Sequence, residues 1–163
     1  MPVFNEAPTI TAIVERVRAV PLDKEIVLVN DASSDGTHSI AEDLTGPDIK
    51  VIHHPINRGK GAAIRTGLEA ATGDVVVIQD ADLEYDPNDF PRLVAPIAEG
   101  KANVVYGVRS LDTQRTIMRF GNNFLTFVTN VTYGGHLKDM ETCYKMMRRE
   151  IAISLDLECR RFD

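Results

Sequence analysis

Two carboxylates separated by a single residue, Asp80 and Asp82, follow an apolar run at 75–79. Alternate side chains of an extended chain point the same way, so this spacing predicts that both carboxylates face one spot. Two negative charges so close repel each other unless a cation neutralises them, and carboxylate oxygens are ligands that Mg²⁺ and Mn²⁺ prefer. Glu84 is a candidate third ligand. A solvated acidic loop is the alternative, but the position directly after the most apolar run favours a divalent metal site.

A glycine-containing segment, Asn-Arg-Gly-Lys-Gly at 57–61, opens a helical pattern that continues to residue 71. Glycine lets backbone N–H groups approach an anion, and the N-terminus of a helix attracts negative charge. The segment is not a Walker motif, because neither Ser nor Thr follows Lys60, and it lacks the third glycine of a dinucleotide fingerprint. It predicts an anion-binding turn that includes Lys60, and a glycine turn that allows close helix packing is the alternative.

Further charged residues follow other apolar runs. Glu6 and Asp31 are candidates to hydrogen-bond a nucleobase or ribose, and helix capping is the alternative for both. Arg109, at the end of a later apolar run, is a natural partner for phosphate. Asp139 and Glu141 share one face only if their segment is extended.

The elements that must position these residues alternate between strand and helix patterns. Predicted strands lie at 2–4, 25–29, 50–53, 75–79 and 103–106, and predicted helices lie after Pro8 and at 36–44, 59–71, 86–99 and 117–133. Such alternation predicts right-handed crossovers and a mainly parallel sheet flanked by helices, a Rossmann-like α/β fold. Ligands of such sheets bind beyond the carboxyl ends of the strands, where the polar residues above are found.

Residues near the predicted helix ends and in the last helix add detail. Ser33, Ser34 and Asp35 supply oxygens to cap the helix at 36–44, and Asp86 with the following proline opens the helix at 86–99. The helix at 117–133 is apolar on more than one side. Either further chain covers it, or it lies at a membrane surface.

Composition excludes several classes of protein. The chain has 163 residues, which suits one domain, and its formal net charge of −6 disfavours a nucleic-acid partner. It contains no apolar run long enough to span a bilayer and no visible signal peptide. Its two cysteines form neither a disulfide framework nor a zinc ribbon, and we expect reduced thiols of an intracellular protein. The histidines follow no metal-ligand spacing and are expected to be structural or surface residues: His38, His53, His54 and His136.

Charge is unevenly distributed along the chain. Residues 1–100 carry 8 basic and 17 acidic side chains, whereas residues 101–163 carry 10 basic and 7 acidic ones. Among the acids of the first part, Asp80, Asp82 and Glu84 belong to the predicted metal site. The basic second part suits phosphate groups and an anionic membrane surface.

Together these residues resemble the family 2 glycosyltransferases of GT-A fold, and most closely the dolichol-phosphate mannose synthase and polyprenyl-phosphate glycosyltransferase branch. Six segments in family-like order carry the resemblance over essentially the whole chain: 2–6, 29–37, 57–63, 79–87, 105–109 and 139–145. The resemblance implies a single catalytic domain at 1–163, truncated at both ends. Residues 1–110 are then the nucleotide-sugar half, and 111–163 are part of the acceptor half.

The resemblance also implies how the donor is bound. Pro2, Phe4, Glu6 and Asp31 are expected to surround the base and ribose of a nucleotide-sugar, with Lys60 as a further substrate-binding residue. Asn30 and Val108 depart from the family, because many relatives have Asp and Ser at these positions.

The same resemblance assigns the metal and catalytic residues. Asp80 and Asp82, with Glu84 where relatives often have Gln, are expected to hold Mg²⁺ or Mn²⁺ on the diphosphate. Arg109 is expected to contact phosphate, and Asp139 matches the acid near the acceptor. Asp82, Arg109 and Asp139 are therefore the expected catalytic residues.

The implied activity is inverting transfer of a hexose, mannose or glucose, to a dolichyl or polyprenyl phosphate. A lipid phosphate is already anionic, so Asp139 is expected to position the acceptor rather than deprotonate it. A saccharide hydroxyl acceptor and a non-catalytic nucleotide-sugar-binding module are the alternatives. We expect a cytoplasmic protein that contacts the cytoplasmic face of a membrane, and the sequence indicates no oligomeric state.

Overall fold

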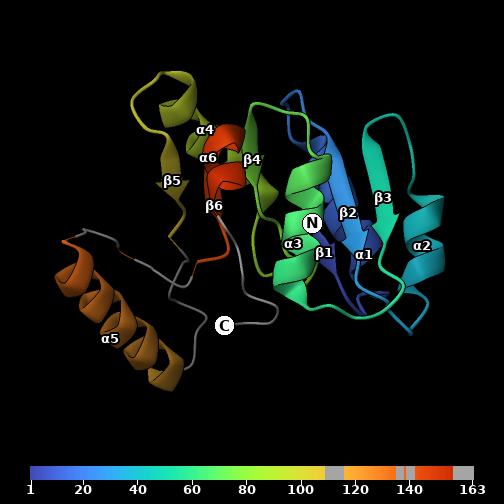
Figure 1. The fold of residues 1–163 in the computed structure, drawn as a ribbon, viewed down its shortest axis with the longest axis horizontal. Helices are drawn as coiled ribbons and strands as arrows, with labels where there is room; N and C mark the ends of the chain where they lie inside the picture. Colours follow the sequence, from blue (N-terminus) through green and yellow to red (C-terminus); the bar gives the residue numbers. More distant parts are fainter. Residues whose placement is uncertain (109–115, 135–137, 139–141, 156–163) are drawn as a thin grey trace.

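The structure is a computed structural model of the 163-residue chain. It describes residues 1–108, 116–134, 138 and 142–155, and for residues 116–123 it describes the backbone alone. Figure 1 shows two sheets side by side, with helices packed around them and one long helix, α5, set apart. This arrangement confirms the predicted α/β fold.

The first sheet is wholly parallel, as the alternating pattern predicts. Its order is β1-β2-β3, formed by β1 (Pro2–Val3), β2 (Ile26–Asn30) and β3 (Ile49–His53). In the register, Val3 pairs with Asn30 and Asn30 pairs with His53, so the three strands end side by side. The segments that follow them therefore emerge along one edge of the sheet.

The second sheet contains a strand that the sequence pattern did not reveal. Its order is β4-β6-β5, with β4 (Val75–Val77), β5 (Val104–Tyr106) and the additional β6 (Lys145–Arg148), which runs antiparallel to both neighbours. Because β6 runs the opposite way, its beginning lies beside the carboxyl ends of β4 and β5. Residues 142–145 thus reach the same edge as the predicted site.

Helices cover both faces of the first sheet, which explains why β2 is apolar up to its last residue, Asn30. Every residue of β2 is buried. Val27 and Val29 pack with Ala63 on the α3 side, whereas Ile26 and Leu28 belong to the larger core that includes α1. Successive strand residues face opposite sides, so a strand between two helical layers has no face left for polar residues.

The predicted helices appear in the expected order, and one further helix, α6, was not predicted. They are α1 (Ile10–Ala19), α2 (Thr37–Asp43), α3 (Lys60–Ala70), the short 3₁₀ helix η1 (Pro87–Asp89), α4 (Phe90–Ala98), α5 (Thr116–Tyr133) and α6 (Arg149–Ser154). The side chain of Asp86 accepts a hydrogen bond from the Asn88 N–H at 3.0 Å, which confirms the predicted cap. Asp35 likewise accepts from the Thr37 N–H at the start of α2.

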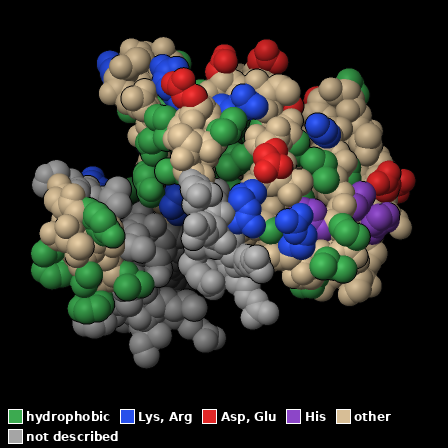
Figure 2. Space-filling model, viewed as in Figure 1, with side chains coloured by type: hydrophobic (Ala, Val, Ile, Leu, Met, Phe, Trp, Pro, Cys, Tyr) green, Lys and Arg blue, Asp and Glu red, His purple; other side chains and the backbone are tan. Residues whose placement is uncertain are grey.

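Apolar side chains of α5 lie on the surface. Phe124, Phe127, Val131 and Tyr133 are 59%, 64%, 68% and 83% exposed, while Thr126 is buried. Figure 2 shows these hydrophobic side chains on the outside of α5. Within the described part of the chain, no helix combines the length and hydrophobicity needed to cross a membrane.

Close approach of β5 and β6 depends on Gly107. A Cβ at this position would lie 2.8 Å from the Tyr144 Cβ, which is closer than packed atoms tolerate. Gly107→Ala should therefore destabilise the protein by about 1–3 kcal/mol, a typical overpacking cost. Thermal unfolding checks this, because each kcal/mol lowers the Tm by roughly 2–4 °C in a domain of this size. Gly46→Ala is the control, since its nearest neighbour lies at 3.5 Å, and an equal Tm loss in both variants would contradict the packing argument.

Candidate active site at the carboxyl edge of the sheets

The loops that follow β1 and β2 are joined to each other by hydrogen bonds. The Asn5 N–H donates to Ser33 Oγ at 2.9 Å, and the Ser34 N–H donates to Asn5 Oδ1 at 2.9 Å. Ser33 and Ser34 thus bind the neighbouring loop. The sequence predicts that both cap α2, and neither does. Asn5 and Ala32 adopt left-handed backbone, with φ of 57° and 60°. Such conformations cost roughly 1 kcal/mol or more and concentrate at functional sites.

Glu6 belongs to the same pair of loops. Its N–H donates to Thr37 Oγ1 at 2.9 Å, and its carboxylate accepts from the Thr9 hydroxyl at 2.7 Å. Asp35 accepts from the Ala7 N–H at 3.1 Å, and hydrogen bonds, above all from Thr37, lower the pKa of its carboxyl. The predicted donor residue Glu6 therefore sits in a loop whose backbone is held at several points.

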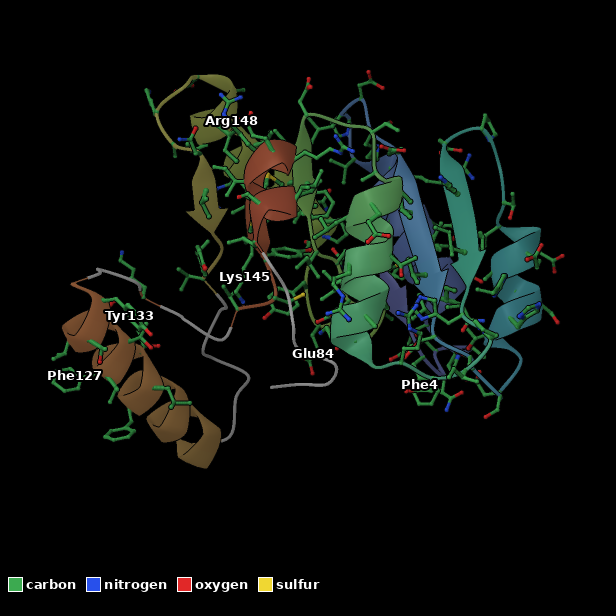
Figure 3. All side chains as sticks on the ribbon, in the orientation of Figure 1. Phe4, Glu84, Phe127, Tyr133, Lys145 and Arg148 are labelled. Atoms are coloured by element: carbon green, nitrogen blue, oxygen red, sulfur yellow. The ribbon has the colours of Figure 1, made fainter. Side chains whose placement is uncertain are left out.

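Pro2 and Phe4, the other predicted base contacts, occupy different positions. Pro2 is part of β1 and pairs with Val29, whereas Phe4 lies just beyond the strand with 49% of its surface exposed. Figure 3 shows Phe4, Glu84 and Lys145 along one edge of the molecule, with Arg148 at the opposite edge. An exposed phenyl ring at this edge is available to stack on a planar base.

Asp31 is buried, with 3% exposure, and the protein itself occupies both of its oxygens. Oδ1 accepts from the Arg58 N–H at 2.9 Å and contacts His54 Nδ1 at 2.6 Å, while Oδ2 accepts from the Gly59 N–H at 2.7 Å. Asp31 therefore caps the beginning of α3 from a neighbouring strand. This supports the capping alternative, and a role in base binding stays a prediction. His54 also contacts Thr66 Oγ1 at 2.9 Å, which suits the expected structural histidine.

Lys60 and Asp80 form the charged centre of the edge. The Lys60 Nζ lies 2.6 Å from Asp80 Oδ1, and the two side chains are 29% and 17% exposed. Burial alone would lower the pKa of Lys60, but the hydrogen bond and charge of Asp80, helped by the charge of Asp82, outweigh burial and raise it. The anion-binding turn and the acid pair, predicted from separate segments, thus meet in space.

Asp82 and Glu84 lie in the turn after Asp80. Asp82 Oδ1 accepts from the Glu84 N–H at 3.1 Å, and both side chains are exposed. Leu83 between them has φ of 66°, a third left-handed residue beside the site. The donor atoms of Asp80, Asp82 and Glu84 are all oxygen, the ligand type that hard divalent cations prefer. In this structure Lys60 pairs with Asp80, so an ion would have to compete with the lysine.

Residues at the start of β6 support the turn after Asp80, and the sequence pattern did not reveal this support. The Tyr144 hydroxyl donates to Gln79 Oε1 at 2.8 Å, and Gln79 Nε2 donates to the backbone oxygen of Asp80 at 2.9 Å. The Cys143 N–H donates to the Tyr85 hydroxyl at 2.9 Å. Burial and the nearby Asp80 charge raise the pKa of the Cys143 thiol to about 12, which makes it a poor nucleophile.

Lys145 adds a positive charge at this edge. Its Nζ donates to the Thr142 backbone oxygen and lies 5.6 Å from the centre of the Tyr106 ring. Two predicted site residues, Arg109 and Asp139, lie outside the described residues. Their roles therefore stay predictions.

A parallel sheet beside an antiparallel one, with acids and lysines at the edge where β1, β2, β4 and β5 end, is the arrangement of an α/β domain of GT-A type. The chain belongs to the glycosyl transferase family 2, whose family model matches residues 1–155.

Curated relatives are similar to nearly the whole of the chain. It is 33% identical to an undecaprenyl-phosphate 4-deoxy-4-formamido-L-arabinose transferase of Pseudomonas fluorescens, over 98% of this chain and 48% of that protein. A transferase of the same name from Pseudomonas syringae is 34% identical over 98% of this chain and 49% of its own length. The chain thus spans about half the length of the curated relatives it matches.

Solved structures agree on the fold. Glucosyl-3-phosphoglycerate synthase from Mycobacterium tuberculosis, in complex with Mn²⁺ and uridine-diphosphate-glucose, superposes with a TM-score of 0.72 at 22% identity, covering 92% of this chain and 55% of that chain. The mannosyltransferase PcManGT from Pyrobaculum calidifontis, in complex with GDP-Man and Mn²⁺, superposes with a TM-score of 0.60 at 32% identity. The match covers 69% of this chain and 35% of that chain.

From the Lys60–Asp80 pair we predict how the protein binds a divalent cation in the absence of nucleotide. Lys60→Met should tighten Mn²⁺ binding about tenfold, the equivalent of ~1.4 kcal/mol, because Lys60 no longer competes for Asp80. Titration of Mn²⁺ by electron paramagnetic resonance, without nucleotide, measures this. Lys60→Arg keeps the charge and should stay near the wild-type affinity. Weaker Mn²⁺ binding by Lys60→Met would show that the lysine does not compete with the ion.

Proposed function

We propose that the chain is the catalytic domain of a metal-dependent inverting glycosyltransferase that transfers a sugar from a nucleotide-sugar to a dolichyl or polyprenyl phosphate. Family membership supports transfer from a nucleotide-sugar, and the curated relatives named above are undecaprenyl-phosphate transferases. The observation that carries the proposal is the meeting of Lys60, Asp80 and Asp82 at the carboxyl edge. A diphosphate and its cation need this combination of charges.

Different described residues are assigned to different parts of the nucleotide-sugar donor. Phe4 offers an exposed ring for the base, and the loop that carries Glu6 lies directly behind it. Asp31 holds the start of α3, whose N–H groups and Lys60 present positive charge to the diphosphate. Each of these groups binds or orients the donor, and none needs to gain or lose a proton.

Asp80, Asp82 and Glu84 would hold Mg²⁺ or Mn²⁺, and this ion would supply Lewis-acid stabilisation of the departing diphosphate. We assign Arg109 to a phosphate contact and Asp139 to the acceptor. The acceptor phosphate is anionic near neutral pH, so Asp139 positions it and no strong base is required. Residues 1–110 then form the donor half of the domain, and 111–163 contribute to the acceptor half.

The sugar is the least constrained part of the proposal. The resemblance favours mannose or glucose, whereas the curated relatives are named for a formamido-arabinose. Purified protein should be offered polyprenyl phosphate and a saccharide acceptor, with Mn²⁺ and labelled nucleotide-sugars of all three sugars. Lipid-extractable label from one donor supports the proposal. Label on a saccharide acceptor, or nucleotide binding without turnover, would overturn it in favour of another function.

Removal of the acids tests the metal role. Asp80→Asn and Asp82→Asn should each reduce sugar transfer by at least about a hundredfold, since loss of one electrostatic contact to the transition state costs roughly that much. EDTA should abolish transfer, and added Mn²⁺ should restore it. Asp86→Asn is the matched control, because asparagine caps a helix as well as aspartate does. Undiminished activity in EDTA would contradict the metal role.

We also propose that α5 contacts the cytoplasmic face of a membrane, where a polyprenyl phosphate acceptor is held. Its exposed Phe127, Val131 and Tyr133 support this, together with the excess of basic residues at 101–163. Aromatic and aliphatic side chains on one helix, with positive charge nearby, suit an anionic lipid surface.

Vesicle binding tests the membrane contact. The combined variant Phe127→Ser and Val131→Ser should lower partitioning to phosphatidylglycerol vesicles about tenfold, because two exposed apolar groups no longer enter the lipid. Ile56→Ser is the control, since Ile56 is 68% exposed but lies in the loop before α3. Equal losses in both variants, or no binding by the unaltered protein, would refute a specific role for α5.

A further inference from the structure

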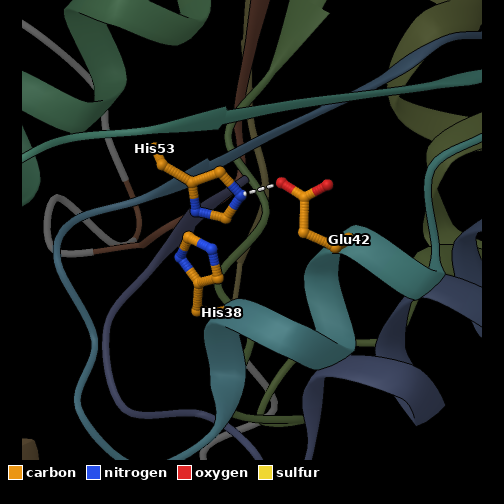
Figure 4. A group of neighbouring side chains, drawn as sticks. All are labelled: His38, Glu42 and His53. Atoms are coloured by element: carbon orange, nitrogen blue, oxygen red, sulfur yellow. Dashed lines mark hydrogen bonds and ion pairs between the residues drawn. The ribbon is translucent and has the colours of Figure 1, made fainter.

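Three metal-ligating side chains meet beside β3, the edge strand of the first sheet (Figure 4). His38 and Glu42 lie four residues apart on α2, so both project from the same face of the helix. His53 is the last residue of β3, which packs against α2. One ligand atom from each residue lies within 4.8 Å of the other two. The sequence spacing did not suggest this cluster, because His53 comes from a different element than His38 and Glu42.

The three side chains already contact one another. Glu42 Oε1 lies 2.6 Å from His53 Nε2, and the rings of His38 and His53 are 3.9 Å apart between centroids with 32° between their planes. The cluster also reaches solvent, since His38 and Glu42 are exposed and His53 is half-buried. Figure 2 shows histidine side chains at the surface on this side of the molecule.

We propose that His38, Glu42 and His53 bind a first-row transition metal ion such as Zn²⁺ or Co²⁺, with water completing the coordination. Two imidazole nitrogens and one carboxylate oxygen are a ligand set that Zn²⁺ accepts, with bonds of roughly 2.0–2.2 Å. The all-oxygen set of Asp80 and Asp82 instead favours harder ions. The two sites therefore differ in ligand chemistry as well as in position.

Asn30 governs how readily the cluster takes up an ion. Its Oδ1 accepts from the Ser33 N–H at 3.1 Å and from the Ser33 hydroxyl at 2.5 Å, which leaves its Nδ2 to donate to His53 Nδ1 at 2.9 Å. Neutral His53 therefore carries its proton on Nε2, where it faces Glu42. Ligation through Nε2 moves this proton to Nδ1, where a ligating histidine needs an acceptor.

The Asn30 contact makes the proposal specific to this chain. To accept from the Nδ1 proton, the Asn30 amide must rotate, and Ser33 then loses its oxygen acceptor. A carboxylate at this position accepts from His53 and Ser33 together without rotation. Asn30→Asp should therefore tighten metal binding, whereas a mere surface adsorption of ions would not depend on a buried residue.

The experiment uses protein that carries Asp80→Asn and Asp82→Asn, so that the carboxyl-edge acids do not contribute. Co²⁺ is titrated and its visible absorption recorded, and Zn²⁺ is then added as a competitor. We expect about one Co²⁺ per chain, displaced by Zn²⁺, because Zn²⁺ loses no ligand-field stabilisation on entering a four-coordinate site, whereas Co²⁺ does. This readout requires no enzymatic activity and stays valid if the proposed transfer reaction is absent.

Substitutions within the cluster, and one outside it, test whether these side chains bind the Co²⁺. His38→Gln and Glu42→Gln should each weaken Co²⁺ binding at least about tenfold, while Asn30→Asp should strengthen it by a similar factor. Glu69→Gln, an exposed acid on α3, is the matched control and should have no effect. Because His38 and Glu42 are exposed, circular dichroism should show an unchanged fold in both variants. Absence of Co²⁺ binding, binding that survives both substitutions, or weaker binding by Asn30→Asp would each overturn the proposal.

Discussion

The two hydrogen bonds that Asp31 accepts from the backbone at the start of α3 hold the site together. They join the end of β2 to the Arg58–Gly59 turn and so fix where Lys60 begins its helix. Gly59 has φ of 86°, a conformation that a side chain would strain, and this lets its N–H face the carboxylate. Together with the packing of Ala63 against Val27 and Val29, this contact directs Lys60 toward Asp80 beside the second sheet.

Charge imposes the next constraint. An acid pair at the end of a strand needs a positive partner, and Lys60 provides one at Asp80 in the protein as it stands. Under the function that we propose, Lys60 and a divalent cation would compete for this carboxylate until a diphosphate offered Lys60 a second anion. The lysine of the glycine turn and the acid of another strand are thus already paired in the protein.

Periodicity and turn chemistry were sufficient to predict the layers, the strand order along the chain and the edge that gathers polar residues. β2 could be predicted because two helical layers bury both of its faces. The role of Asp86 could be predicted because its cap involves only residues close in sequence. β6 was missed because Lys145–Arg148 is a short run of mixed character whose partners, β4 and β5, are distant in sequence. The support that Tyr144 gives to Gln79 depends on that pairing and could not be predicted without it.

The same limit explains Asn30 and its surroundings. From the sequence, Asn30 is only a departure from the acid of many relatives, and His53 is an ordinary strand end. The register places the two residues opposite each other, and their side chains then determine each other's hydrogen bonds. Because Asn30 contacts both Ser33 and His53, and Ser33 also accepts from the Asn5 N–H, the hydrogen bonds of the β3 edge are linked to those of the loops after β1 and β2. A single amide connects the two regions, and its rotation would exchange the donor and the acceptor that it presents to each of them.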